Sequence, residues 1–382
     1  DEALQEQLHE PEGSFKKYFE YTTDIYSIAA PVFLYKEIKI FSWKAVKMLF
    51  QFRKLDAFRT MHESNKAHFT NPKTVQLFDR YATYTGSSPY KAPATLNIIP
   101  HVEHAYGGWL PKNGIHAIPE AMARVAREND VDIQLNSSVD SIVKEGKKVT
   151  GVKIGGEKHQ CDIVVANSDV KATYHSLLGD RDSKMAKRYE QLEPSSSGLV
   201  FYWGMDCAFP EFSINNILFS DNYQEEFHEL FESMHVPSKP TVYINITSKL
   251  IPTDAPRGCE NWFVLVNAPC NVGQDWEAEI KKARNSVLEK IKETIGEDVS
   301  GHIMHEHLLS PVDIQRLTGS SQGSLYGISS NSRTAAFKRQ SNNSKRYKNL
   351  YFAGGSAHPG GGIPMVTLSG KICSRLIMED HS

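Results

Sequence analysis

The sequence of 382 residues lacks the patterns that mark several common classes of protein. Its five cysteines are scattered and form no CxxC pair, which argues against a disulfide framework and a zinc site and is typical of a reducing cytosol. No apolar run approaches the roughly 18 residues that a membrane-spanning helix needs. HExxH does not occur, so nothing indicates a zinc protease of that type. We expect a cytoplasmic protein with no metal cofactor.

Strong charge of one sign is also missing. The net charge is −2, with 23% charged and 40% apolar residues, a composition typical of a globular protein. Such a balance gives no reason to expect nucleic acid as a partner. The length exceeds that of one typical domain, so we expect two lobes that share a core.

Glycine, in contrast, is concentrated near the end of the chain. Leu350 to Ala353 is apolar enough for a buried central strand, and a helix is predicted to follow and to run to about Met378. The turn between them contains five glycines, which allow sharp turning and close approach of other groups to the backbone. Pro364 suits the first turn of a helix. A glycine turn before a helix N-terminus predicts a site for an anionic group, because free N–H groups and the helix dipole point toward it.

These residues carry a family resemblance. The run from Tyr351 to Pro364 resembles the C-terminal signature of the phytoene desaturase family, the FAD-dependent bacterial carotenoid desaturases, and the resemblance extends through most of the chain. It implies an α/β fold of the FAD-dependent amine-oxidase type, with a Rossmann-type FAD domain, incomplete here, and a substrate domain of mixed β-sheet and helices. It also implies FAD as the cofactor and a lipophilic carotenoid as the substrate. The cofactor-binding residues that it implies are Val139, Asn167, Gly354, Gly355, Gly361, Gly362, Ile363 and Pro364.

The same resemblance implies a division of the chain into four sections. Residues 1–112 form a helical, membrane-associated part of the substrate domain, and 113–178 form the middle section of the FAD domain. Residues 179–346 form the substrate domain with its β-sheet, and 347–382 form the C-terminal section of the FAD domain. In the middle section we expect a helix over 118–129, a short strand over 131–135, an apolar alternation over 138–143, a strand over 148–154 and a buried strand over 162–169. The resemblance implies that one strand ends near Val139 and that the buried strand ends at Asn167.

A GxGxxG fingerprint is absent from the sequence. Desaturases of this family place that fingerprint at their N-terminus, where it opens the dinucleotide-binding βαβ unit. We therefore expect that the N-terminal Rossmann segment of the family is not among these residues.

A basic and aromatic stretch lies near the start of the chain. Phe33 to Lys54 interleaves apolar residues with six lysines and arginines, and Glu37 is its only acid. Such a stretch can lie in a membrane interface, or it can be a helix pair with a solvated lysine face. A lipid-soluble polyene substrate favours the first interpretation, which predicts peripheral association with the inner face of the membrane.

The predicted substrate domain is rich in aromatic strands and also carries histidines. Desaturation needs few catalytic side chains, because the flavin accepts the hydride. His358, inside the glycine turn, is a candidate to hydrogen-bond the flavin or the substrate, or to fix its own loop. His305 and His307 form an HxH without further ligands at metal-binding spacing. The aromatic residues suit either a slot for a long conjugated chain or an ordinary core, and they are Tyr202, Trp203, Tyr243, Trp262 and Phe263.

Four segments are most similar to the 1-hydroxycarotenoid 3,4-desaturase branch of the family. That branch implies desaturation at the end of an acyclic, hydroxylated carotenoid. Phytoene desaturases and carotenoid end-group oxygenases are near alternatives, and a flavin-dependent carotenoid isomerase or a non-catalytic carotenoid-binding protein are more distant ones. The four segments are 241–249, 254–263, 273–276 and 323–331.

Overall fold

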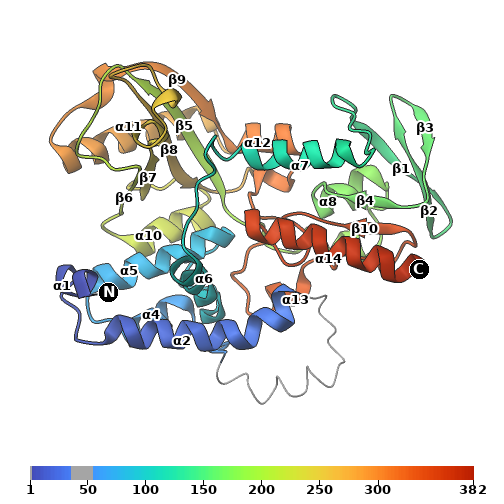
Figure 1. Cartoon of the computed structure of the whole chain (residues 1–382), viewed down its shortest axis with the longest axis horizontal. Coiled ribbons are helices and arrows are strands. Elements are labelled where there is room, and N and C mark those ends of the chain that lie inside the picture. The colour runs from blue at the N-terminus through green and yellow to red at the C-terminus, as the bar shows by residue number, and fades with distance from the viewer. Residues whose placement is uncertain (1, 36–54) are drawn as a thin grey trace.

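A computed structural model describes residues 2–35 and 55–382, and these residues form three regions (Figure 1). The first region is helical and has an aromatic core around Phe15, Tyr18 and Phe78. Thr60 begins one of its helices with a capping box, in which its hydroxyl and the Glu63 carboxylate satisfy each other's backbone N–H groups. The helices of this region are α1 (Glu2–Gln7), α2 (Ser14–Ala29), α4 (Met61–His68), α5 (Pro72–Asp79), α6 (Ile98–Tyr106) and α10 (Tyr223–His228).

The second region is a five-stranded antiparallel sheet in the order β6-β7-β8-β5-β9, with α11 packed on one of its faces. Successive residues of a strand point to opposite faces of the sheet, so neighbouring side chains along a strand have different surroundings. Trp203 and Trp262 point to the α11 face and are almost fully buried, whereas Tyr202 is 39% exposed. The elements are β5 (Ser197–Met205), β6 (Asn215–Leu218), β7 (Val242–Asn245), β8 (Glu260–Ala268), α11 (Trp276–Ile295) and β9 (Ile303–Leu309).

The third region joins segments that are far apart in the sequence. Strand β10 pairs in parallel with β4, and this pairing brings the C-terminal glycine turn beside residues 167–169. Its elements are α7 (Ala117–Glu128), β1 (Val139–Glu145), β2 (Lys148–Ile154), β3 (Glu157–Gln160), β4 (Val164–Ala166), α8 (Val170–Ala172), α9 (Lys184–Glu190), β10 (Leu350–Phe352) and α14 (Ile363–His381).

Two short helices lead from the sheet back to the third region. Helix α12 (Pro311–Thr318) has Pro311 in its first turn and a capping box between Ser310 and Asp313. Helix α13 (Ala335–Lys338) follows after a loop that contains Tyr326. These segments position the residues that support the glycine turn.

Three predictions for the third region were wrong. Residues 131–135 form no strand, and β1 begins at Val139, so no strand ends there. The predicted buried strand over 162–169 is reduced to β4, in which Val165 is 45% exposed. A strand is buried on both faces only when neighbours cover it, and within the described part of the chain β4 pairs with β10 alone.

The predicted membrane segment, Phe33 to Lys54, lies mostly outside the described residues. Only its first three residues are described, and two of them end a π-helical turn over Ala30–Leu34. Within 2–35 and 55–382, none of the helices combines the length and the apolar character needed to cross a bilayer.

Candidate functional site

The glycine turn between β10 and α14 is the centre of the candidate site. Gly354 follows β10 with a φ of +103°, and a Cβ there would lie 2.2 Å from Oδ1 of Asn167. Asn167 is the residue that follows β4. Two residues predicted from separate parts of the sequence are therefore in direct proximity, and the close approach of the Asn167 side chain explains why position 354 requires glycine.

The other predicted glycines have different surroundings. A Cβ at Gly361 would lie 2.5 Å from Cδ1 of Tyr326, so protein packing requires glycine there. A Cβ at Gly355 would meet nothing closer than 3.6 Å, and one at Gly362 would have no neighbour within 4 Å. We expected the cofactor to exclude side chains at 354, 355 and 361. At positions 354 and 361, packing within the protein already excludes a side chain. Of these four glycines, only 355 and 362 have open space where a Cβ would lie.

Helix α14 begins directly after this open space. Gly362 precedes its first turn, which contains Ile363 and Pro364, and no side chain caps this end of the helix. Gly362, Ile363 and Pro364 are exposed to solvent. An exposed helix N-terminus without a capping side chain presents free N–H groups and a partial positive charge, which together suit an anionic group such as a pyrophosphate.

Buried polar side chains fix the shape of the turn. Ser369 of α14 is fully buried; its hydroxyl accepts a hydrogen bond from the Gly354 N–H at 3.1 Å and donates to the His358 carbonyl at 2.7 Å. The amide of Asn342 donates to the same carbonyl at 2.9 Å. The His358 N–H in turn donates to the carbonyl of Gln340 at 2.8 Å. The backbone of His358 thus anchors the loop, and its side chain is buried, while the predicted role of its imidazole beside the flavin stays a prediction.

Arg339 is a supporting residue that the sequence analysis did not identify. Its guanidinium donates to the carbonyls of Gly355, Tyr326 and Ile328 at 2.7, 2.9 and 2.9 Å. Burial lowers the pKa of Arg339 to about 10, so the side chain stays charged at neutral pH. It therefore clamps the glycine turn to the loop of Tyr326 and places a positive charge beneath the turn. A lone arginine in a polar run offers no sequence signal for this role.

Val139 lies in the same region but in a different sheet. It opens β1 and pairs with Ile154 of β2. Ile142 of β1 and Ala166 of β4 belong to the same hydrophobic core, which the sheet of β1 shares with the sheet of β4. The contact between the Val139 backbone and the adenine, which the family resemblance implies, stays a prediction.

Aromatic side chains lie on the open face of the five-stranded sheet and also beside the glycine turn. Phe263 lies 5.5 Å from Tyr202 and 6.3 Å from Tyr243, centroid to centroid. Burial raises the pKa of both Tyr243 and Tyr326, and the nearby Tyr84 phenol raises each further. Tyr326 in turn packs against Gly361. We call these five residues, Tyr202, Phe263, Tyr243, Tyr84 and Tyr326, the aromatic path. Trp203 and Trp262 belong to the core instead.

The fold agrees with that of known oxidoreductases. An oxidoreductase from Methanosarcina mazei superposes with a TM-score of 0.60 at 16% identity and covers 89% of this chain and 74% of its own. Cyclohexylamine oxidase from Brevibacterium oxydans gives 0.56 at 11% identity, with coverage of 96% and 76%. The family of flavin-containing amine oxidoreductases matches residues 44–201. The protein is an FAD-dependent oxidoreductase with the amine-oxidase fold.

Sequence relatives define the family more closely. A 1-hydroxycarotenoid 3,4-desaturase from Flavobacterium is 42% identical over 98% of this chain and 77% of its own length. A 4,4'-diapolycopene oxygenase from Methylomonas is 33% identical over 96% and 75%. The chain belongs to the bacterial carotenoid desaturase family, as the resemblance of residues 351–364 predicted.

Proposed function

We propose that the protein introduces the 3,4 double bond at the end of an acyclic 1-hydroxycarotenoid. Structurally, the proposal is carried by the aromatic path, because a long conjugated chain needs apolar and aromatic walls to hold it. The choice of this bond is supported by the similarity to the 1-hydroxycarotenoid 3,4-desaturase, which extends over 98% of the chain.

Some residues of the site would bind the cofactor, and others would bind the substrate. FAD, when bound, supplies the acceptor for the hydride that leaves the carotenoid. The first turn of α14, with Gly362 before it, would hold the negative pyrophosphate, and Gly355 leaves room beside it. Tyr326 packs against Gly361, so the end of the aromatic path lies at the glycine turn. The aromatic path would orient the polyene there and exclude water.

The mass of the product tests this function against its alternatives. Incubation with an acyclic 1-hydroxycarotenoid should give a product two hydrogens lighter, with absorption shifted to longer wavelength because conjugation is extended. A product of unchanged mass would mean isomerisation, and a product that gains oxygen would mean end-group oxygenation, which the similarity to the diapolycopene oxygenase favours. Either of these outcomes would refute the desaturase assignment. Desaturation of phytoene alone would keep that assignment and refute the choice of the 3,4 bond of a 1-hydroxycarotenoid.

We also propose that the substrate enters from a membrane to which Phe33–Lys54 binds. Each basic residue near an anionic surface contributes on the order of 1 kcal/mol. Reversing Lys36, Lys39 and Lys47 to glutamate should therefore abolish most co-sedimentation with acidic liposomes. A matched control reverses three exposed lysines of the β1–β3 hairpins, Lys147, Lys153 and Lys158, and should leave binding much less affected. Equal binding by both triple variants and the wild type would contradict the proposal.

A further inference from the structure

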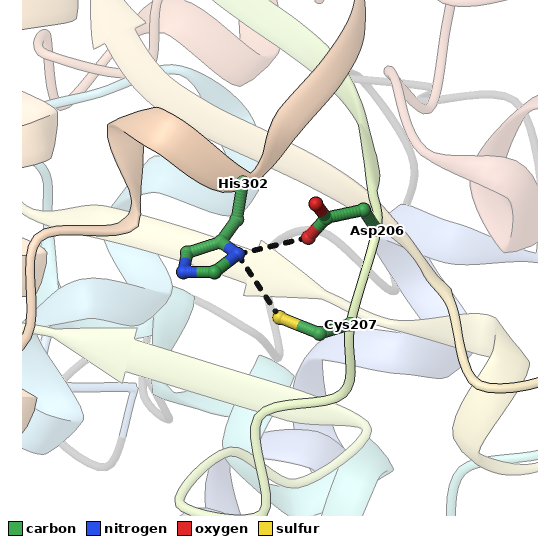
Figure 2. A group of neighbouring side chains, drawn as sticks. All are labelled: Asp206, Cys207 and His302. Atoms are coloured by element: carbon green, nitrogen blue, oxygen red, sulfur yellow. Dashed lines mark hydrogen bonds and ion pairs between the residues drawn. The ribbon is translucent and has the colours of Figure 1, made fainter.

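A second cluster of chemically active side chains lies at one end of the five-stranded sheet, away from the glycine turn. Asp206 and Cys207 follow β5, and His302 ends the short turn that precedes β9. Nδ1 of His302 lies 2.8 Å from Oδ1 of Asp206 and 3.4 Å from Sγ of Cys207. Figure 2 shows both side chains directed at the same ring nitrogen. All three ligand atoms lie within 4.8 Å of one another.

We propose that Asp206, Cys207 and His302 bind a divalent transition-metal ion of the zinc type. One carboxylate, one thiolate and one imidazole are ligands that Zn²⁺ accepts, with bonds of about 2.0 Å to nitrogen and oxygen and about 2.3 Å to sulfur. Tetrahedral geometry with these bonds separates the ligand atoms by about 3.3–3.6 Å. The Cys207–His302 separation already fits, and the Asp206 carboxylate needs to retreat by about half an ångström.

The surroundings of His302 resemble those of an established metal ligand. Its other ring nitrogen, Nε2, lies 3.8 Å from the carboxylate of Glu297. This is an ion-pair distance and is too long for a hydrogen bond. Metal-binding histidines commonly donate this second N–H to a carboxylate, so Glu297 would have to approach Nε2 to fix the tautomer and make the ring a better ligand. The ring also packs edge-on against Phe209, with centroids 5.7 Å apart. A backbone hydrogen bond from the Asp206 N–H to the His302 carbonyl, at 3.1 Å, holds the two segments together.

Charge and access also favour a cation at this cluster. The carboxylates of Asp206 and Glu297 place negative charge beside the cluster, 2.8 and 3.8 Å from the two ring nitrogens of His302. A bound cation would relieve this negative field and displace the thiol proton to solvent, so one proton is released as the metal–sulfur bond forms. His302 and Asp206 are 37% and 44% exposed, which leaves the ligands open to an ion from solution.

With three protein ligands, solvent would complete the tetrahedron around the ion, and the place of the cluster at the end of the sheet separates its role from the proposed desaturation. The ion would tie the end of β5 to the start of β9, two neighbouring strands whose ligands are distant in sequence. Binding to the folded state alone stabilises it in proportion to the logarithm of ligand concentration over Kd. Excess Zn²⁺ should therefore raise the melting temperature of the wild-type protein, whether or not a carotenoid is turned over.

Cobalt spectroscopy tests the ligands directly. One equivalent of Co²⁺ added to the FAD-loaded protein should produce a thiolate-to-metal charge-transfer band and tetrahedral d–d bands, and Zn²⁺ should abolish both. The Cys207→Ser variant should lose the charge-transfer band. The controls Cys161→Ser and His305→Gln, which alter residues outside the cluster, should keep it. Absence of the band in the wild type, or its persistence in Cys207→Ser, would overturn the proposal.

A second variant keeps all three ligands and changes only Glu297, the carboxylate next to the His302 ring. Glu297→Gln should weaken Co²⁺ and Zn²⁺ binding by about 10- to 100-fold, as loss of such outer partners typically does. Its melting temperature without metal should stay close to that of the wild type, because Glu297 contributes only a partly exposed contact at 3.8 Å. An unchanged metal affinity in Glu297→Gln would contradict the part of the proposal in which Glu297 supports the His302 ring.

Discussion

Replacing Gly355 with valine should remove most of the flavin from the protein while leaving its thermal stability close to that of the wild type. A Cβ at Gly355 would meet no protein atom closer than 3.6 Å, and its φ lies outside the left-handed region. The new side chain should therefore cost little in the protein itself. It would fill the space beside the open N-terminus of α14. Overpacking of a filled site costs about 1–3 kcal/mol, so FAD binding should weaken roughly 5- to 150-fold.

Gly354→Ala provides the contrasting control. A Cβ at Gly354 would lie 2.2 Å from Asn167 Oδ1, at a φ of +103° that other residues rarely adopt. This variant should lose folding stability first and flavin as a consequence. Flavin absorbance and melting temperature measured together separate the two cases. Full flavin occupancy in Gly355→Val would contradict the placement of FAD at this turn.

Arg339→Met should lower both folding stability and flavin occupancy. The variant removes three hydrogen bonds from a charged donor and leaves the carbonyls of Gly355, Tyr326 and Ile328 without that partner. Hydrogen bonds to charged groups contribute about 1.5–3 kcal/mol each, so losing all three should destabilise the fold by several kcal/mol. The glycine turn should then become misplaced relative to Tyr326, and FAD should dissociate more readily.

Two further variants make the Arg339 test specific. Arg339→Lys keeps the charge but lacks the planar fork of donors, so it should rescue only part of the loss. Arg333→Met changes an exposed arginine six positions earlier and should behave as the wild type. Urea denaturation measures the stability, and the flavin-to-protein absorbance ratio measures the occupancy. Wild-type values for both in Arg339→Met would show that the clamp is dispensable.

Much of the local structure could be predicted because local signals determine it. Helix α12 begins where Ser310, Pro311 and Asp313 indicate, since a capping box needs only residues within one turn. Helix α11 and strands β5 and β8 bury continuous apolar stripes, which are patterns that a sequence displays locally. The glycine turn is also found between a strand and a helix, as predicted.

The candidate site depends on contacts that sequence spacing does not reveal. Arg339 acts by hydrogen bonds to backbone carbonyls. Every residue has such a carbonyl, so the sequence does not indicate which ones Arg339 contacts. Tyr202 is exposed and Trp203 is buried, because successive residues of β5 point to opposite faces of the sheet. The aromatic content of the strand does not reveal this difference, but its alternation would have done so. Cys207 and His302 come together only because β5 pairs with β9.

Anaerobic mixing of the FAD-loaded protein with an acyclic 1-hydroxycarotenoid tests the central claim most directly. Without oxygen, the hydrogens removed from the substrate have the flavin as their acceptor. The account predicts that the oxidised-flavin absorbance is lost in proportion to product, one equivalent for each molecule that becomes two hydrogens lighter. Consumption of the carotenoid with the flavin still oxidised, or a product of unchanged mass, would contradict the assignment of this protein as a flavin-dependent carotenoid desaturase.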